Sequence, residues 1–134
     1  MKLTYYNLIN IFTREFPEIC KNREKEINDL SWEIQQNCVY AFYEEIVKPS
    51  FLYLLELEYR KSINEDVVQS KSLVKLLEFF EKMACSDDAS VNEVLQVAIF
   101  EFITMDVEML KFLHEILSTE SKLVFEQSLN YRLN

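Results

Sequence analysis

The chain has 134 residues, of which 49 % are hydrophobic and 28 % charged, and its formal net charge at pH 7 is −9. This length and hydrophobic content suit one domain with a sizeable core and exclude a disordered chain. Not one residue is glycine, although about 7 % is usual, so glycine-rich phosphate loops and the nucleophile elbow of hydrolases are excluded. Hairpin turns that need glycine are disfavoured. We therefore predict an all-α protein, with residues 1–134 forming a single helical domain.

The first half of the chain predicts helices that prolines separate. Apolar side chains follow helical spacing over residues 4–15. Pro17 ends this helix, and a short helical turn restarts over 18–24. The longest apolar stripe covers 27–48 and predicts one continuous helix that the next proline ends, and the pattern over 49–61 is helical again.

Capping residues mark the next boundaries. Ser62 or Asn64 is the predicted cap of a helix whose most regular apolar spacing lies at 73–83. The segment CSDDAS, residues 85–90, predicts a loop. Asp87, Asp88 and Ser90 are all predicted caps of the following helix, and Ser90 has a glutamate three residues later, which is the spacing of a capping box.

The last part of the chain predicts three more helices. Residues 91–103 are apolar on nearly all sides, which is typical of a fully buried helix. Asp106 is the predicted start of the next helix, and Ser118 or Thr119 the predicted cap of the last. Together these segments predict a compact irregular bundle of six or seven helices.

The negative charge is concentrated in residues 78–120, which contain ten acidic and two basic residues, a balance of −8, whereas the rest of the chain comes to −1. This sign excludes direct binding to nucleic acid. The acidic segment is either a solvated face or a docking surface for a basic protein partner. For the second interpretation the candidate partner-binding residues are Asp87, Asp88, Glu101, Asp106, Glu108 and Glu115.

No cofactor or metal site is predicted from the cysteines. Cys20, Cys38 and Cys85 lie far apart, and neither a CxxC nor a CxxH pattern is present. We expect free, buried thiols in a reducing compartment. The first residues lack the long apolar run of a signal peptide, and no stretch approaches the roughly 18 consecutive apolar residues of a membrane span. These features predict a cytoplasmic protein without a membrane segment.

Catalytic residues are not predicted either. His114 is the one histidine, and we expect it half-buried on a helix rather than in a catalytic triad. A di-iron helical bundle needs two Glu-x-x-His units, which one histidine does not supply. Glu78, Glu81, Glu101 and Glu108 are better explained by a charged outer face. An enzyme that uses carboxylates and a metal is the minor alternative.

Aromatic residues suggest a second candidate interface. Trp32 and Tyr43 lie close to Glu33 and Glu44 in the sequence. Tryptophan and tyrosine are enriched at protein interfaces because they combine a large apolar area with a polar group. An exposed patch around these four residues is therefore one hypothesis, and core positions for the aromatic rings are the other.

Four segments together suggest a family. Phe16-Pro17-Glu18-Ile19 follows a short amphipathic helix, LVKLLEFFEKM occupies 73–83, VNEVLQVAIFEFI begins at Val91, and Leu117-Ser118-Thr119-Glu120 precedes the last helix. This order resembles a group of small all-helical bacterial domains of unassigned function, some of which look like immunity proteins of contact-dependent and polymorphic toxin systems. The resemblance covers most of residues 5–128.

The resemblance implies a protein that binds one cognate toxin tightly and carries out no chemistry. Such toxins often have basic substrate clefts, which an acidic domain complements. We therefore expect a non-enzymatic protein-binding domain, an immunity protein that neutralises a toxin through its acidic surface. The alternative is a homo-oligomeric scaffold or regulatory protein, a homodimer for example, in which the VLQVAIFEFI segment is partly exposed in the monomer.

Overall fold

The computed structural model describes residues 2–62 and 70–133, and helices account for 82 % of the protein, with no strand in the described part. The predicted all-α fold is confirmed. With α5 and α6 counted as one continuous rod, the described residues form nine helices rather than the six or seven predicted.

The α-helices are α1 (Leu8–Glu15), α2 (Pro17–Asn22), α3 (Glu24–Asp29), α4 (Ser31–Gln35), α5 (Val39–Phe42), α6 (Lys48–Ser62), α7 (Lys71–Ala84), α8 (Ala89–Val94), α9 (Val107–Ile116) and α10 (Thr119–Leu133). A 3-10 turn, η1 (Tyr5–Asn7), precedes α1, and two π-helical stretches, η2 (Tyr43–Val47) and η3 (Leu95–Phe100), extend α5 and α8.

The predicted continuous helix over 27–48 is wrong, because the chain breaks after α4. Asn37 has a φ of 57°, in the left-handed region. Asparagine tolerates this conformation better than other residues with a side chain beyond Cβ. In a chain without glycine it takes the place that glycine usually has at such a break. A further break lies at Leu30, where α3 ends and α4 begins, and it adds a helix to the number predicted.

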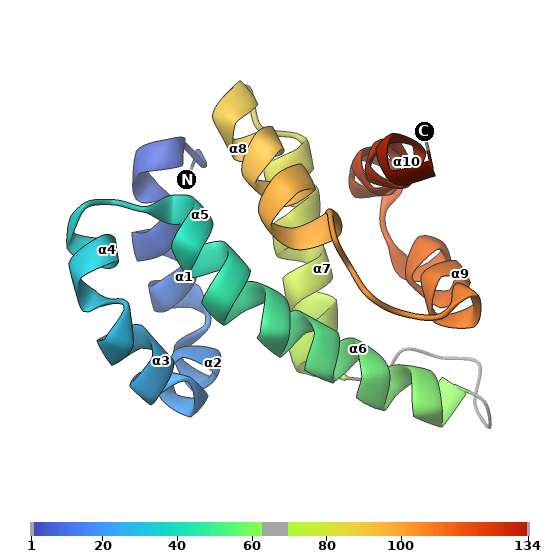
Figure 1. Ribbon diagram of the computed structural model, residues 1–134, viewed down its shortest axis with the longest axis horizontal. Coiled ribbons are helices and arrows are strands. Elements are labelled where there is room, and N and C mark those ends of the chain that lie inside the picture. Colours follow the sequence, from blue (N-terminus) through green and yellow to red (C-terminus); the bar gives the residue numbers. More distant parts are fainter. Residues whose placement is uncertain (1, 63–69, 134) are drawn as a thin grey trace.

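The prediction that a proline ends the helix before residue 49 is also wrong. The backbone runs from α5 through η2 into α6, and Pro49 is the second residue of α6 (Figure 1). The N–H of Lys48 donates to the carbonyl of Tyr43, five residues back. Proline lacks an N–H, and its ring clashes with the carbonyl four residues earlier in a regular α-helix. The wider π turn just before Pro49 removes that conflict, so the helix continues.

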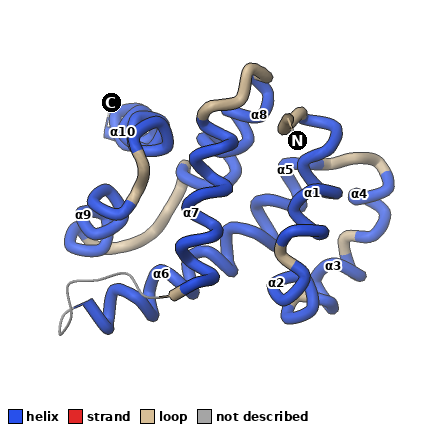
Figure 2. The backbone as a smooth tube through the Cα atoms, turned by 180° about the vertical axis from the view of Figure 1, so that it is seen from behind, coloured by secondary structure: helices blue, strands red, loops and turns tan. Residues whose placement is uncertain are grey.

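The core lies around α7. Helix α10 packs on α7 and η3, α6 packs on α7, and α9 covers α6 (Figures 1 and 2). Buried phenylalanine rings join these elements. The ring centre of Phe80 of α7 lies 5.0 Å from that of Phe51 of α6 and 6.1 Å from that of Phe100 of η3. The ring centres of Phe100 and Phe125 of α10 are 5.4 Å apart. The edge-to-face geometry of these rings stabilises the packing beyond the area they bury. Residues 73–83 present their apolar side to this core as predicted.

Helix α10 is capped by a side chain from α7. The sequence predicts Ser118 or Thr119 as the cap, but the backbone N–H groups of Glu120 and Ser121 donate to the carboxylate of Glu81 at 3.1 and 2.8 Å. The Ser121 hydroxyl donates to the same carboxylate at 2.9 Å. Partial burial favours a higher pKa for Glu81, but these three hydrogen bonds and one from the Cys85 thiol outweigh it and lower the pKa.

Three other helix starts can be compared with the predicted caps. Asp106 caps α9 as predicted, since its carboxylate accepts the N–H of Met109 at 2.9 Å. Of the three predicted caps of α8, Asp88 is the one observed, and its carboxylate accepts the N–H of Ser90. Helix α7 is capped by Ser70. Of its two predicted caps, Ser62 is the last residue of α6, and Asn64 lies outside the described residues.

Among the described helices, none combines the length and apolar character needed to cross a membrane.

Candidate protein-binding surface

Helix α9 is amphipathic, and its outer face is charged. Its buried side contains Leu113 and lies against α6, where Phe112 contacts Tyr59 with ring centres 5.5 Å apart. Glu108 and Glu115 are two turns apart on the exposed side. Lys111 lies between them and approaches Glu108 to 3.8 Å. The structure therefore places two of the predicted partner-binding acids on one face, with one lysine between them.

The turn that connects η3 to α9 exposes a phenylalanine. Phe102 is 72 % exposed and has a φ of 59°. The residues on either side are buried, Glu101 at 8 % exposed and Ile103 completely. The ammonium group of Lys48 donates to the backbone carbonyl of Glu101 at 2.7 Å. Buried neighbours and this bond hold the backbone in a strained conformation that turns the aromatic ring outward.

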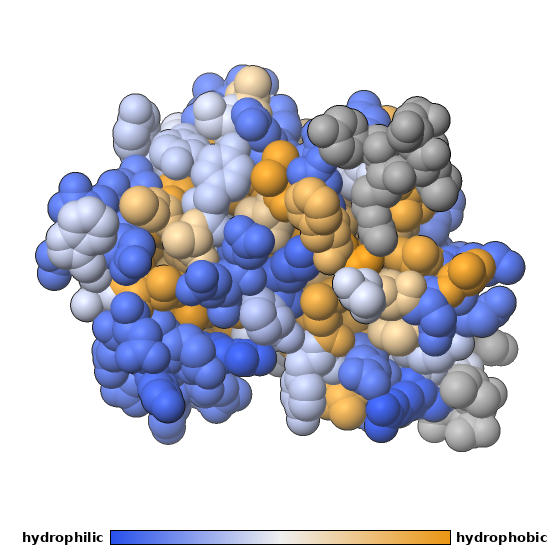
Figure 3. All heavy atoms as spheres, viewed as in Figure 1, coloured by the Kyte–Doolittle hydropathy of each residue, from blue (hydrophilic) through white to orange (hydrophobic). Residues whose placement is uncertain are grey.

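A second exposed apolar residue, Val107, is the first residue of α9 and is 63 % exposed. It follows Asp106, whose carboxylate both caps α9 and stays exposed. Figure 3 shows hydrophobic residues at the surface next to hydrophilic ones over α9. We use the term α9 surface for Phe102, Asp106, Val107, Glu108 and Glu115. It combines an aromatic anchor with exposed acids, the arrangement expected of a site for a basic protein.

The remaining predicted acids lie elsewhere. Asp88 accepts the backbone N–H groups of Tyr5 and Ser90 at 2.9 and 3.0 Å, so it ties the amino-terminal segment to the start of α8. Asp87 is exposed and pairs with Lys2 at 3.3 Å. The whole length of α8 and η3 separates this loop from the turn at Phe102 (Figure 1). Glu101 is part of the turn but is largely buried. The six predicted residues are thus not one continuous patch.

Sequence reasoning missed Phe102. The apolar pattern over 91–103 runs on without a break, so Phe102 is expected inside a helix. The helix in fact ends at Phe100, and the burial predicted for it holds for Val91, Leu95 and Ile99. One signal for the turn was present: Asp106, as a helix cap, requires a non-helical segment before it.

The hypothesis of an exposed patch at Trp32 and Tyr43 is wrong. Trp32 is 66 % exposed, but Tyr43 is fully buried and donates its hydroxyl to the carbonyl of Leu8 at 2.8 Å. Burial is the largest cause that raises the pKa of Tyr43 well above its usual value, and the nearby Cys20 and Glu15 raise it further. Tyr43 is a core residue that joins η2 to α1.

The titratable side chains that could carry chemistry are dispersed. His114 of α9 is half-buried as expected, and its Nε2 lies 2.7 Å from a carboxylate oxygen of Glu126 on α10. Cys20 and Cys38 are partly buried, whereas Cys85 is exposed, contrary to the expectation of buried thiols. Within residues 2–62 and 70–133, no three histidine, cysteine, aspartate or glutamate side chains are grouped as metal ligands.

Comparison with known proteins identifies no relative: no family model matches the chain, and neither the curated proteins nor the solved structures contain a match.

Proposed function

We propose that this domain is a non-enzymatic protein-binding module that takes a basic partner on the α9 surface. The observation that carries the proposal is Phe102, an exposed aromatic ring on a left-handed backbone between two buried residues. A bulky residue in this conformation costs about 1–2 kcal/mol of stability. Strain of this kind persists where the surroundings enforce it, and it is concentrated at functional sites.

An aromatic ring at the centre of a docking surface supplies much of the binding energy. Residues of this kind cost about 2 kcal/mol or more in binding free energy when truncated, once the partner covers them. In the α9 surface, Glu108 and Glu115 supply exposed negative charge on the helix that follows the turn at Phe102. They favour a partner with basic residues and speed its approach.

The resemblance to immunity proteins supports a toxin domain as this partner. In this proposal the protein blocks a basic functional cleft of the toxin and needs no catalytic group of its own. We place the interaction in the cytoplasm, a reducing compartment that suits its three free cysteines.

The test uses association kinetics with a defined probe, the basic carboxyl-terminal domain of an exported protein encoded next to this chain. In the variant E108K/E115K two acids of the α9 surface are reversed. We expect its association rate at low salt to fall by about tenfold or more, and the difference to shrink as salt is added.

A matched control carries the same charge change on another helix. Glu24 and Asp29 are exposed acids of α3, which lies at the opposite end of the molecule from α9 (Figures 1 and 2). The variant E24K/D29K should therefore retain most of the association rate. Equal rates for the two double variants would rule out the α9 surface as the docking site and leave only a general effect of net charge.

A second copy of the chain is the other candidate partner, because Phe102 and Val107 are exposed apolar residues. Most of the VLQVAIFEFI segment is buried against α7 and α10 of its own chain, and Phe102 is its exposed apolar residue. In addition, two copies of the α9 surface would bring like charges together. A concentration-dependent dimer in sedimentation experiments, abolished by F102A, would favour this alternative over a basic partner.

A further inference from the structure

Three tyrosine rings lie close together at a part of the molecule that the α9 surface does not include. The amino-terminal turn η1 lies beside α5 and α8 (Figures 1 and 2). Tyr5 and Tyr6 belong to η1, and Tyr40 belongs to α5. The ring centre of Tyr5 is 5.6 Å from that of Tyr6 and 6.2 Å from that of Tyr40. We use the term tyrosine cluster for these three residues.

Tyr6 is the exposed member of the tyrosine cluster, with 80 % of its surface accessible. Its ring is perpendicular to that of Tyr5, with an angle of 88° between the two planes. Two perpendicular rings in contact form a corner in which a cation can lie within about 6 Å of both ring centres. The faces of aromatic rings carry partial negative charge. The corner between Tyr5 and Tyr6 therefore favours a positively charged ligand.

A carboxylate of α8 lies next to the tyrosine cluster. The Tyr40 hydroxyl donates a hydrogen bond to Glu93. Burial is the largest cause that raises the pKa of Tyr40, and the charge of Glu93 and the nearby Tyr5 hydroxyl raise it further. Because both hydroxyl groups act on one another, the Glu93 carboxylate lies close to Tyr5 as well as to Tyr40.

The Glu93 carboxylate keeps the capacity to bind a cation. Glu93 is exposed, and among the residues that the structure describes no lysine or arginine forms an ion pair with it. Lys2, the basic residue of the amino-terminal segment, pairs with Asp87 instead. A carboxylate has about four acceptor positions, of which the Tyr40 hydroxyl takes one.

A second carboxylate adds negative charge on the other side of the turn. Asp88 accepts the backbone N–H of Tyr5 at 2.9 Å, so its charge lies against the backbone of η1. The ring faces, Glu93 and Asp88 thus all favour a ligand of the same sign.

We propose that the tyrosine cluster and Glu93 bind an arginine side chain of a protein partner. The guanidinium lies in the corner between Tyr5 and Tyr6 and donates to the Glu93 carboxylate, which the Tyr40 hydroxyl holds in place. Arginine suits this site better than lysine, because its guanidinium is planar, stacks on aromatic rings and is more weakly hydrated than an ammonium group. A hydrogen bond between a guanidinium and a carboxylate is also stronger than one between neutral groups.

The test is an NMR titration of the full chain, at low salt, with the peptide acetyl-Gly-Arg-Gly-amide. The comparison peptide has citrulline in place of arginine, which keeps the shape of the side chain but replaces the guanidinium by an uncharged urea group. We expect saturable shifts of the backbone amides of Tyr6 and Glu93, with a dissociation constant on the order of 10 mM for the arginine peptide. The citrulline peptide should bind at least about tenfold more weakly. Equal binding of the two peptides would overturn the proposal.

A third peptide, with lysine in place of arginine, separates recognition of a guanidinium from attraction of any cation. We expect it to bind about threefold more weakly or worse. Equal affinity for the lysine and arginine peptides, or shifts confined to the acids of α9, would indicate a general effect of the net charge of −9 and contradict the proposed site.

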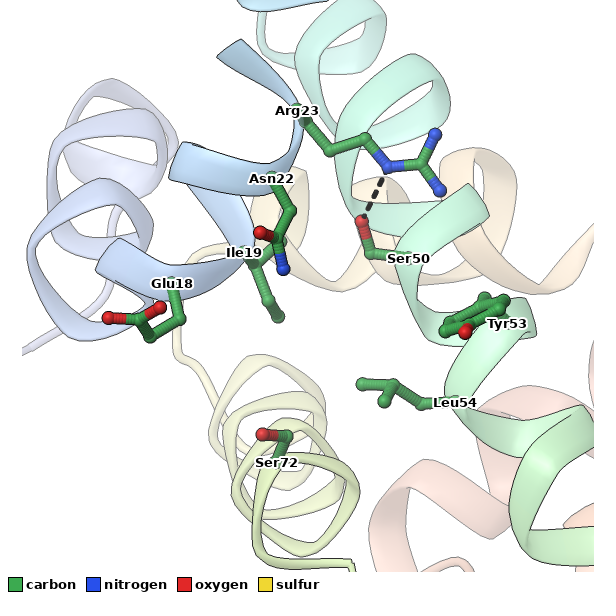
Figure 4. Close-up of a pocket in the computed structure, with 8 residues that line it drawn as sticks. All are labelled: Glu18, Ile19, Asn22, Arg23, Ser50, Tyr53, Leu54 and Ser72. Atoms are coloured by element: carbon green, nitrogen blue, oxygen red, sulfur yellow. Dashed lines mark hydrogen bonds between the residues drawn. The ribbon is translucent and has the colours of Figure 1, made fainter.

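Variants of exposed tyrosines test the aromatic part of the site. Y6L should weaken binding of the arginine peptide by about fivefold or more, whereas Y6F keeps the ring face and should bind like the wild type. Tyr53 provides a matched control, because it is a 61 % exposed tyrosine of α6 that lines a separate groove between α2, α6 and α7 (Figure 4). Y53L should leave binding unchanged, and equal weakening by Y6L and Y53L would rule out the corner at Tyr6.

Variants of exposed glutamates test the charged part. E93Q should weaken binding of the arginine peptide by about fivefold or more. E115Q removes the same charge from α9 and should change it little. Equal effects of the two would contradict the role of Glu93. Failure of the arginine peptide to bind the wild type refutes the tyrosine cluster as a site and leaves the α9 surface untouched, since the two lie on different elements.

Discussion

Single side chains of this protein join helices that are distant in the sequence. Glu81 of α7 accepts three hydrogen bonds from the first turn of α10, 39 and 40 residues later. A carboxylate at this position both satisfies free N–H groups and interacts favourably with the positive end of the helix dipole. One glutamate thus acts as the cap of a helix to which it does not belong.

We expect E81Q to destabilise the protein by about 1 kcal/mol, a typical value for a lost helix cap. E78Q is the matched control, because Glu78 lies on the exposed side of the same helix. Urea unfolding of both variants at neutral pH measures the difference. Equal midpoints would mean that the carboxylate does not stabilise α10.

The same contact predicts a pH dependence. The pKa of Glu81 is lowered in the folded protein from its usual 4.5, so its contribution to stability is complete above that value. It is lost as the pH falls through the lower pKa of the folded state. The difference in unfolding free energy between the wild type and E81Q should therefore be constant near neutral pH and shrink below about pH 4.5. A difference that grows on acidification would contradict the assignment.

Phe102 gives a prediction in which stability and binding change independently of each other. In F102G the left-handed backbone is no longer strained, so F102G should be more stable than F102A by up to about 1 kcal/mol. Both variants lack the ring, so both should bind a partner of the α9 surface more weakly by about 2 kcal/mol, roughly thirtyfold. Thermal unfolding and binding assays on the same two proteins separate the effects. Binding as tight as that of the wild type would remove Phe102 from the interface.

At the scale of elements, the helices with clear caps and apolar stripes could be predicted from the sequence. Residues 73–83 and the start of α9 at Asp106 were predicted correctly because their signals are local. The break at Asn37 and the passage through Pro49 could not be predicted, since each depends on how the flanking helices pack. Hydrophobic periodicity is insensitive to a single left-handed residue or a π turn.

The candidate surface shows the same division. Its acids on α9 could be predicted from the charge of the segment, whereas Phe102 belongs to an apolar run that looks continuous. Asp88 and Glu101 carry the negative charge predicted for the surface, but both are held in place by contacts within the fold. Asp88 accepts the N–H of Tyr5, and the backbone carbonyl of Glu101 accepts a hydrogen bond from Lys48, and neither contact is visible in the sequence. The composition of the segment therefore predicted that the surface is acidic, but not which residues form it.

The break between α4 and α5 can be tested through its backbone conformation. N37A should destabilise the protein by about 1 kcal/mol, because alanine disfavours a φ near 57°. N37G should have a smaller effect, since glycine adopts this φ freely. Thermal unfolding of the pair checks the expectation, and an N37A protein as stable as the wild type would show that the break is not under strain.

At the scale of the whole molecule, the row of buried phenylalanines unites the two halves of the chain. Phe80 contacts rings on α6 and η3 and is fully buried. F80A should lower the free energy of unfolding by about 3–5 kcal/mol, a large part of the roughly 5–15 kcal/mol of a typical domain. F102A, the same substitution at an exposed site, should cost far less. Denaturant unfolding gives both values, and similar losses would contradict the central role of Phe80.

The bond between Asp88 and the N–H of Tyr5 spans 83 residues, as does the one from the Ser86 hydroxyl to the carbonyl of Leu3. Closing a loop of this length costs more conformational entropy than forming the local helices within it, so it is the slower step. The amino-terminal segment therefore docks on the loop before α8 only after most of the chain has assembled. During refolding, hydrogen exchange at Tyr5 should slow last, so this amide is a natural reporter of the final docking step.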